Sequence, residues 1–419
     1  MDQRRVFLRS SMIAGAASLC SRAALGATDE IVVGVIGTGT RGHHLAETFM
    51  RQPKCRVAAV CDVFQTNLDR TTKLLDGKAA AYKDYRRVIE RKDIDAVAIA
   101  TPDHWHGPMT VEACQAGKDV YVEKPISNNI EDALKMLEAA RRNNRVVQVG
   151  LQQRSAPVFQ EAYRVLKTGL LGRITHAHCV HPFRGRDLDK TPGQPPPGLD
   201  WEMFQGPAPR RPYSIARHRF WRIYREYGGG ILTDWGVHLT DVAHWYMDLQ
   251  PVRSASGSAA TLLRPPDEET MPDTISVAWK YDNLIMTFGT WGAEYGNYFW
   301  GERGVLHVNR SGYSARPGSQ TMAATRNPAR AAPSSASQPG ALAKTAFESI
   351  HKELPDDYAS TDIATADHVR NFLDCMRTRL KPITGIEIGF ESSLPTLLGL
   401  LATRTGRTYA WDGKAARAV

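Results

Sequence analysis

Between residues 31 and 150 the chain alternates short apolar runs with amphipathic stretches. The apolar runs are rich in β-branched residues and hydrophobic at consecutive positions, which is typical of strands buried on both faces of a parallel sheet. The amphipathic stretches suit helices. We expect strands at 31–36, 57–60, 96–100, 120–122 and 146–149, and helices at 45–51, 85–91, 109–117 and 131–142. This alternation predicts a doubly wound α/β domain.

The hydrophobic pattern changes after about residue 155. A helical stretch at 158–166 is followed by segments in which apolar and polar residues alternate, and this alternation predicts a mostly antiparallel, open sheet with one covered face. We expect its strands to include 174–180, 274–281 and 284–291. The second domain is therefore also α/β in class.

Two segments follow neither pattern. Residues 186–200 are rich in proline, and residues 310–345 are rich in Ser, Ala, Pro and Arg with almost no aromatic residues. We expect the first to be irregular and the second to be a flexible insertion. The predicted organisation is a dinucleotide-binding domain at 31–150 and a domain for substrate binding and oligomerisation at 151–419.

Composition excludes several classes of protein. Of the 419 residues 42% are hydrophobic and 23% are charged, which argues against a disordered, collagen-like or membrane-embedded chain. The formal net charge is +9 without a long basic block, so it favours an anionic or polar ligand weakly and nucleic acid hardly at all. Six cysteines without a CxxC pair indicate neither a disulfide framework nor a cysteine metal site.

The first 27 residues have the three parts of a secretory signal. Arg4 and Arg5 precede Phe7 and Leu8, a weakly apolar run follows, and small residues lead to a predicted cleavage after Ala27. The Arg-Arg-x-Phe-Leu pattern resembles the twin-arginine type, which exports folded proteins. We expect a periplasmic or extracellular protein that uses the twin-arginine export machinery. A disordered basic tail is the alternative, and the apolar run is too short for a stable membrane anchor.

A glycine-rich turn follows the first predicted strand directly. Gly37, Gly39 and Gly42 form the pattern G-x-G-x-x-G, with Thr40 and Arg41 between the last two, and helical sequence follows. Such a turn brings the backbone close to a pyrophosphate and aims a helix N-terminus at it. The alternative is a glycine-rich turn without a ligand.

The second predicted strand ends at Asp62, 20 residues after the last glycine. A carboxylate at this spacing accepts hydrogen bonds from the adenosine ribose and repels a 2′-phosphate. Val63 and Phe64 supply no arginine for such a phosphate. The sequence therefore favours NAD over NADP.

Two further motifs carry candidate chemistry. Lys124, in Glu123-Lys124-Pro125, follows a buried strand at the sheet edge where ligands bind, and a cis bond before Pro125 could aim it. Asp234 and His238 stand four residues apart after a glycine triplet, so on one helix they share a face and suit acid–base chemistry. The alternatives are a solvated lysine and a surface Asp–His pair.

These motifs, in this order and together with Thr101-Pro102-Asp103-His104-Trp105-His106, resemble the Gfo/Idh/MocA family of glucose–fructose oxidoreductase and inositol dehydrogenase. The resemblance covers nearly all of the chain after the leader. It implies an N-terminal Rossmann domain, a C-terminal domain with an open antiparallel sheet, and a homo-oligomer, a dimer or tetramer, formed through that sheet.

The resemblance also implies roles for single residues. Lys124 would position and polarise the reacting oxygen, His238 would be the general base, and Asp234 would be the partner of His238. The positions matching the nicotinamide half of the cofactor site are Thr101, Pro102, His106, Glu123 and Gln152.

The predicted function is that of an exported enzyme, an NAD-dependent oxidoreductase acting on a CH–OH group of a sugar or polyol with a retained cofactor. One alternative is a redox-neutral glycosidase or lyase that uses bound NAD, although the sequence lacks the His-Gly-Gly pattern of the family branch that hydrolyses N-acetylgalactosaminides. A second alternative is a non-catalytic sensor of a sugar or dinucleotide, and the presence of Lys124 and His238 argues against it. Neither a metal site nor nucleic-acid binding has sequence support.

Overall fold

The computed structural model describes residues 29–182, 188–292, 294–318, 350–353 and 361–419. The predicted signal at 1–27 and most of the predicted insertion at 310–345 lie outside the described residues. No helix in the described part of the chain has the length and apolar character needed to cross a bilayer.

The N-terminal part is a six-stranded parallel sheet with the order β3-β2-β1-β4-β5-β6. Its strands are β1 (Ile31–Ile36), β2 (Cys55–Cys61), β3 (Ala80–Tyr82), β4 (Ala96–Ile99), β5 (Asp119–Val122) and β6 (Val147–Val149). Its helices are α1 (Thr40–Met50), α2 (Gln65–Leu74), α3 (Arg86–Ile89), α4 (Asp103–Gln115) and α5 (Ile130–Arg142). The strand order reverses between β1 and β4, and ligands bind at such a switch point. The predicted doubly wound domain is confirmed.

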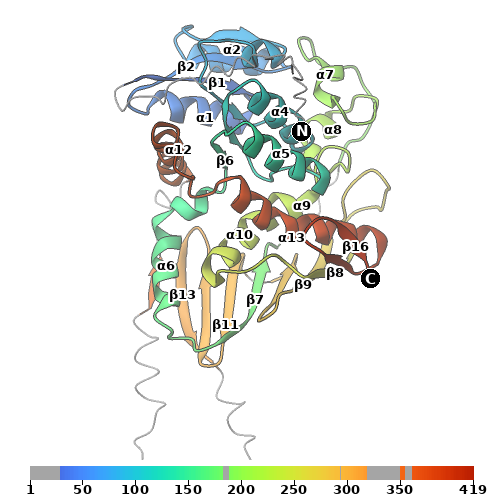
Figure 1. The fold of residues 1–419 in the computed structure, drawn as a ribbon. Helices are drawn as coiled ribbons and strands as arrows, with labels where there is room; N and C mark the ends of the chain where they lie inside the picture. The colour runs from blue at the N-terminus through green and yellow to red at the C-terminus, as the bar shows by residue number, and fades with distance from the viewer. Residues whose placement is uncertain (1–28, 183–187, 293, 319–349, 354–360) are drawn as a thin grey trace, which may run out of the picture.

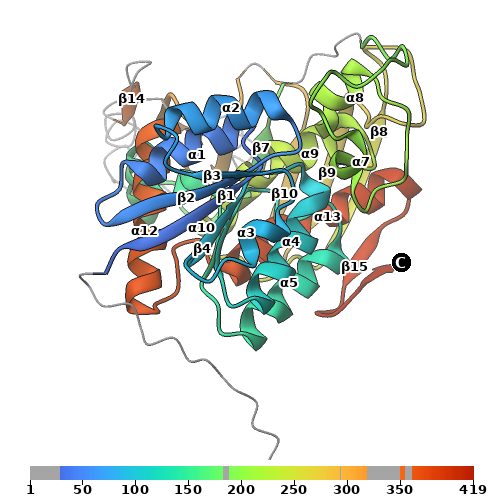
Figure 2. The same cartoon turned by 90° about the horizontal axis from the view of Figure 1, so that it is seen from above.

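Helices cover both faces of this sheet. Figure 2 shows α1 and α2 on one side of the strands and α3, α4 and α5 on the other. All residues of β1, β4 and β5 are buried, which explains their uninterrupted apolar sequences. The sequence analysis missed α2 and β3, because α2 is largely polar and buries only Leu68 and Thr71, and β3 has three residues.

The C-terminal part is a ten-stranded sheet with the order β14-β13-β12-β11-β7-β10-β9-β8-β15-β16. Its strands are β7 (Ile174–Val180), β8 (Ser254–Ala260), β9 (Thr274–Lys280), β10 (Ile285–Gly289), β11 (Gly296–Gly301), β12 (Gly304–Val308), β13 (Gly312–Pro317), β14 (His351–Glu353), β15 (Tyr409–Trp411) and β16 (Ala416–Ala418). Its pairings are antiparallel except that of β10 with β7. The predicted open, mostly antiparallel sheet is therefore confirmed.

Helices line one face of this sheet. Figure 1 shows α6 (Pro157–Lys167), α10 (Gly236–Met247) and α13 (Ile386–Thr405) along it, with α10 and α13 between the two sheets. Trp279 of β9 is fully buried and donates a hydrogen bond from Nε1 to the carbonyl oxygen of Pro395 in α13, at 2.7 Å. The short elements α7 (Trp201–Gln205), α8 (Ile215–Arg219) and α9 (Gly230–Asp234) lie before α10.

Helix α12 (Thr361–Thr378) crosses the predicted boundary at residue 150, because it comes from the C-terminal half but packs beside α1 on the N-terminal sheet (Figure 1). Its Phe372 is fully buried, with ring centroids 6.3 Å from Phe49 and 5.9 Å from Tyr121. The N-terminal core is therefore completed by residues more than 200 positions away.

The packing of α12 generates a stability prediction. Phe372→Ala removes a fully buried ring from the N-terminal core and is expected to lower the free energy of unfolding by about 3–5 kcal/mol. Guanidinium denaturation followed by tryptophan fluorescence measures the change. Arg370→Ala, at an exposed position of the same helix, is the control and is expected to shift stability by less than about 1 kcal/mol. Equal midpoints for the two variants would contradict the role given to α12.

Candidate active site

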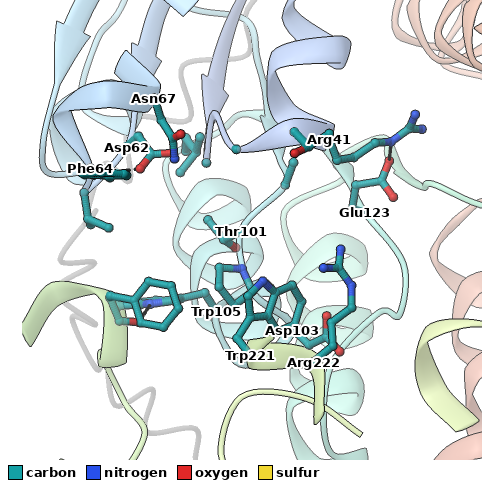
Figure 3. A pocket seen from close by; sticks show the side chains of 18 of the residues that line it. Arg41, Asp62, Phe64, Asn67, Thr101, Asp103, Trp105, Glu123, Trp221 and Arg222 are labelled. Atoms are coloured by element: carbon teal, nitrogen blue, oxygen red, sulfur yellow. Dashed lines mark hydrogen bonds and ion pairs between the residues drawn. The ribbon is translucent and has the colours of Figure 1, made fainter. Parts of the chain in front are cut away.

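A pocket of about 780 Å³ opens between the N-terminal and C-terminal parts of the chain. The glycine turn after β1 and the ends of β2, β4 and β5 line one side of it, and residues of α9 and α10, together with Arg310 in the loop after β12, line the other. In Figure 3, Asp62, Phe64 and Asn67 lie at one end, Arg41 and Glu123 at the other, and Trp221 and Arg222 below. The pocket therefore lies at the carboxyl edge of the parallel sheet, as the topology requires.

The glycine turn has the geometry of a phosphate-binding loop. Gly37 has a φ of +81°, which only glycine adopts readily, and a Cβ on Gly42 would lie 1.7 Å from the carbonyl oxygen of Gly37. A Cβ on Gly39, in contrast, would have no atom within 4 Å, so the backbone here faces open space in the pocket. Helix α1 begins at Thr40 without a side-chain cap, which leaves its first amides for a ligand.

Asp62 follows β2 and lies in the pocket wall beside this turn. Its carboxylate accepts hydrogen bonds from the amides of Thr38, at 2.7 Å, and Phe64, at 2.8 Å, and from Asn67 Nδ2, at 3.2 Å. Burial raises the pKa of Asp62, and these hydrogen bonds oppose the shift. The amides hold the carboxylate at the position predicted for ribose recognition.

The tertiary structure adds two cations that the sequence next to Asp62 does not show. Arg70 of α2 and Lys83 line the same pocket. Arg70 donates to the carbonyl oxygen of Thr38 at 2.9 Å, and Lys83 to that of Gly198 at 2.8 Å. Both are therefore engaged by backbone oxygens rather than free for a phosphate.

The pocket fits a dinucleotide. Four buried polar atoms of residues in its wall have no hydrogen-bond partner among the described residues: Arg41 Nη2, Thr101 Oγ1, Gln152 Oε1 and His238 Nδ1. Buried polar groups are nearly always satisfied, so such atoms in a pocket are available to a ligand. Together with the open backbone at Gly39, they suit a ligand with phosphates at one end and polar groups at the other.

Thr40, Arg41, Pro102 and Glu123, which the sequence also assigned to the cofactor site, line the pocket. Arg41 Nε donates to Glu123 Oε1 at 2.7 Å, and its Nη1 donates to Thr365 Oγ1 of α12 at 3.2 Å. This pair fixes Glu123 directly before Lys124.

His106 does not line the pocket. It is 1% exposed, and its ring nitrogens lie 2.7 Å from the carbonyl oxygen of Pro125 and 3.0 Å from that of Thr101. His106 therefore lies outside the set of residues that line the pocket, unlike Thr101, Pro102, Glu123 and Gln152. His106 instead bridges the carbonyl oxygens of Thr101 and Pro125. The peptide bond between Lys124 and Pro125 is cis, as the sequence suggested.

Asp234 binds Lys124 rather than His238. The ammonium group of Lys124 contacts Asp234 Oδ1 and donates to the Asp234 carbonyl oxygen at 2.9 Å, and Arg222 Nε lies 3.2 Å from Oδ1. Among the described residues no hydrogen bond joins Asp234 to His238, so the predicted Asp–His pair is wrong. The reason is local, because α9 ends at Asp234 and α10 begins at Gly236, and the two residues do not share one continuous helix.

His238 is held neutral by its surroundings. Burial lowers its pKa well below 6.5, and the nearby charges of Arg310, Lys124 and Arg41 act in the same direction. Burial also raises the pKa of Asp103, at the start of α4, to about 8, although Lys124 and Arg222 oppose this shift. At neutral pH the pocket therefore holds an uncharged imidazole that can accept a proton and a protonated carboxyl group.

The glycine triplet serves packing rather than a ligand. A Cβ on Gly228 would lie 2.7 Å from the carbonyl oxygen of Arg222, and one on Gly230 would lie 2.8 Å from Met271 Cβ. A Cβ on Gly236, in contrast, would have its nearest atoms at 3.5 Å, an ordinary contact distance. The triplet thus lets the segment before it fold back over the pocket.

Sequence reasoning missed several residues of the pocket wall: Trp221, Arg222, Trp235 and Arg310. Arg310 falls within the segment predicted to be a flexible insertion, yet β12 and β13 hold it in place from both sides. Trp221 and Arg222 belong to the run from Arg217 to Tyr227, which is rich in aromatic residues and arginine, side chains that suit the faces and hydroxyl groups of sugars. Among the described residues no group of acidic, histidine or cysteine side chains could hold a metal ion.

Comparison with known proteins agrees with this geometry. Residues 31–151 match the model described as "Oxidoreductase family, NAD-binding Rossmann fold", and residues 159–308 match the "GFO/IDH/MocA C-terminal domain". Among curated relatives, inositol 2-dehydrogenase 4 of Saccharopolyspora erythraea is 33% identical over 166 residues, 39% of this chain and 48% of that protein. Glycosyl hydrolase family 109 protein 2 of Shewanella sp. (strain ANA-3) is 30% identical over 232 residues, 45% of this chain and 49% of that protein. The chain thus spans about half the length of these curated relatives.

Solved structures share the fold. The aldose-aldose oxidoreductase of Caulobacter crescentus, complexed with glycerol, superposes with a TM-score of 0.65 at 19% identity, over 91% of this chain and 100% of that one. The WlbA dehydrogenase of Bordetella pertussis, complexed with NADH and UDP-GlcNAcA, gives a TM-score of 0.63 at 18% identity, over 91% and 99%. With both domain models matched in order and the glycine turn in place, the chain belongs to the Gfo/Idh/MocA family of NAD-binding oxidoreductases.

Proposed function

We propose that this protein oxidises a CH–OH group of a sugar or polyol, or reduces the corresponding carbonyl, with NAD as cofactor. One observation carries the proposal: Lys124 and the neutral, buried His238 line the same pocket as the glycine turn and Asp62. The relatives named inositol 2-dehydrogenase and aldose-aldose oxidoreductase support this class of substrate.

The roles of the chain's own residues follow from their contacts. NAD, when bound, supplies the hydride acceptor. Lys124, held by Asp234, donates a hydrogen bond to the reacting oxygen and stabilises negative charge that develops on it. His238 accepts the hydroxyl proton, because its imidazole is neutral. Asp234 therefore acts as a positioning residue for the lysine.

This assignment predicts the effect of two substitutions. Lys124→Ala and His238→Ala are each expected to lower kcat by roughly 10²-fold or more, the usual contribution of a positioned acid–base group. NAD binding, followed by quenching of protein fluorescence, is expected to persist, since the glycine turn is unchanged. Lys135→Ala, on the exposed face of α5, is the matched control. Turnover close to that of the unaltered protein in both pocket variants would refute the assignment.

We also propose export with a retained cofactor. The twin-arginine pattern of the first 27 residues supports export of a folded protein. Free NAD is scarce outside the cytoplasm, so an enzyme there benefits from keeping its cofactor and returning it to the starting state in each cycle. A second substrate that takes the hydride back would achieve this. So would a redox-neutral glycosidase reaction, the second candidate, which the 30% identity to family 109 glycosyl hydrolases supports.

Retention predicts what the isolated protein contains. Protein recovered from the periplasmic fraction, desalted and then denatured, is expected to release close to one nicotinamide dinucleotide per chain. This requires tight binding, since a Kd of 1 nM corresponds to about −12 kcal/mol. Product analysis then separates the two candidates, because only the glycosidase leaves its products without a net oxidation change. Cytoplasmic protein, free of cofactor and releasing NADH steadily, would rule out both export and retention.

A homo-oligomer formed through the open face of the ten-stranded sheet completes the proposal. Ile285 of β10 and Trp300 of β11 both pair with His176 of the central strand β7 and are 45% and 49% exposed, so they form one apolar patch. Light scattering is expected to give a dimer or tetramer, and Trp300→Glu is expected to shift it toward monomer. Leu380→Glu, at another exposed apolar position, is the control. A monomeric unaltered protein would refute this part.

A further inference from the structure

Arg310 is a cation in the pocket that the proposed chemistry does not use. It stands two residues after β12, and its guanidinium carbon lies 4.5 Å from the ring centroid of Trp235. Both residues line the pocket beside Lys124 and His238. The indole face holds the guanidinium from one side and leaves its hydrogen-bond donors toward the cavity.

Among the described residues, the guanidinium of Arg310 has no acidic partner. Within the described residues no carboxylate lies within ion-pair distance and no hydrogen bond leaves its side chain, although its backbone amide donates to Tyr295 Oη at 3.2 Å. Two other buried arginine side chains do have acidic partners. Arg154 lies 2.8 Å from Asp241 and Arg264 lies 3.2 Å from Asp267. An unpaired, half-buried cation is costly unless a ligand supplies the opposite charge.

The excess of basic over acidic side chains in the pocket wall also favours an anionic ligand. Seven Lys and Arg side chains line it against four Asp and Glu side chains, and Asp103, with a pKa of about 8, is mostly protonated at neutral pH. Glu123 forms an ion pair with Arg41, and Asp234 forms ion pairs with Lys124 and Arg222. A dinucleotide diphosphate at the glycine turn offsets part of the excess. Burial lowers the pKa of Arg310, and Asp234 and Glu123 oppose the shift only through space.

We propose that the substrate is an acidic sugar or polyol and that Arg310 binds its anionic group, a carboxylate or a phosphate. The inference rests on the proposed function, because it adds a charge to the sugar or polyol of that same site. The planar guanidinium offers two parallel N–H donors, which match either anion. Arg310 is thus a specificity-determining residue, while Lys124 and His238 serve the reacting hydroxyl.

Isothermal titration of the full chain with saturating NAD tests this. The probes are matched pairs, D-glucuronate against D-glucose and D-galacturonate against D-galactose, with D-glucose 6-phosphate as the phosphate arm. We expect at least one acidic probe to bind about tenfold or more tightly than its neutral partner. Arg310→Gln is expected to abolish this preference and Arg310→Lys to keep part of it. Arg142→Gln, an equal change of charge at an exposed position of α5 outside the pocket, should leave it intact.

The outcomes separate cleanly. Equal affinity for acidic and neutral probes, no binding of any acidic probe at millimolar concentration, or an unchanged preference in Arg310→Gln overturns the proposal. A preference for uronates over the sugar phosphate identifies the anion as a carboxylate, and the reverse identifies a phosphate. Binding heats do not require turnover, so a preserved acid preference without any redox chemistry contradicts the proposed function while leaving the anion site in place.

Discussion

The ion pair between Lys124 and Asp234 is the contact on which the arrangement of the site depends. It joins the end of β5 in the N-terminal sheet to the end of α9 in the C-terminal part, and the two side chains are 14% and 22% exposed. A partly buried pair of this kind is screened less by solvent than a surface pair. Both residues line the pocket, and the contact fixes the position of the ammonium group of Lys124, so the packing of the two parts of the chain also sets the geometry of the proposed site.

The pairing of charges then determines what each remaining group can do. Arg41 pairs with Glu123, and Lys124 and Arg222 share Asp234, and among the described residues no carboxylate forms a hydrogen bond with His238, whose pKa burial and nearby cations lower. The imidazole stays neutral as a result, which suits a base. The same distribution leaves Arg310 without an acidic partner among the described residues, which suits a receptor for an anion. One set of ion pairs thus accounts for both the proposed proton acceptor and the proposed specificity.

The cofactor side of the pocket depends on the distant end of the chain. Helix α12 packs on the N-terminal sheet through Phe372, and its Thr365 accepts a hydrogen bond from Arg41. In the same helix His368 Nε2 lies 3.0 Å from the carbonyl oxygen of Val149 at the end of β6. The dinucleotide-binding domain is therefore not an independent N-terminal unit. Helix α12 completes its hydrophobic core through Phe372 and also binds Arg41, the residue that pairs with Glu123.

The sequence by itself determined the features that depend on neighbouring residues. Consecutive apolar residues marked the buried strands, and the spacing of Gly37, Gly39, Gly42 and Asp62 marked the cofactor turn, because a βα unit is a local structure. Only the tertiary structure decided the partner of Asp234, the role of His106 and the place of Arg310. These depend on a helix break at Trp235 and on contacts between segments about 20 to more than 100 residues apart, which local periodicity does not encode.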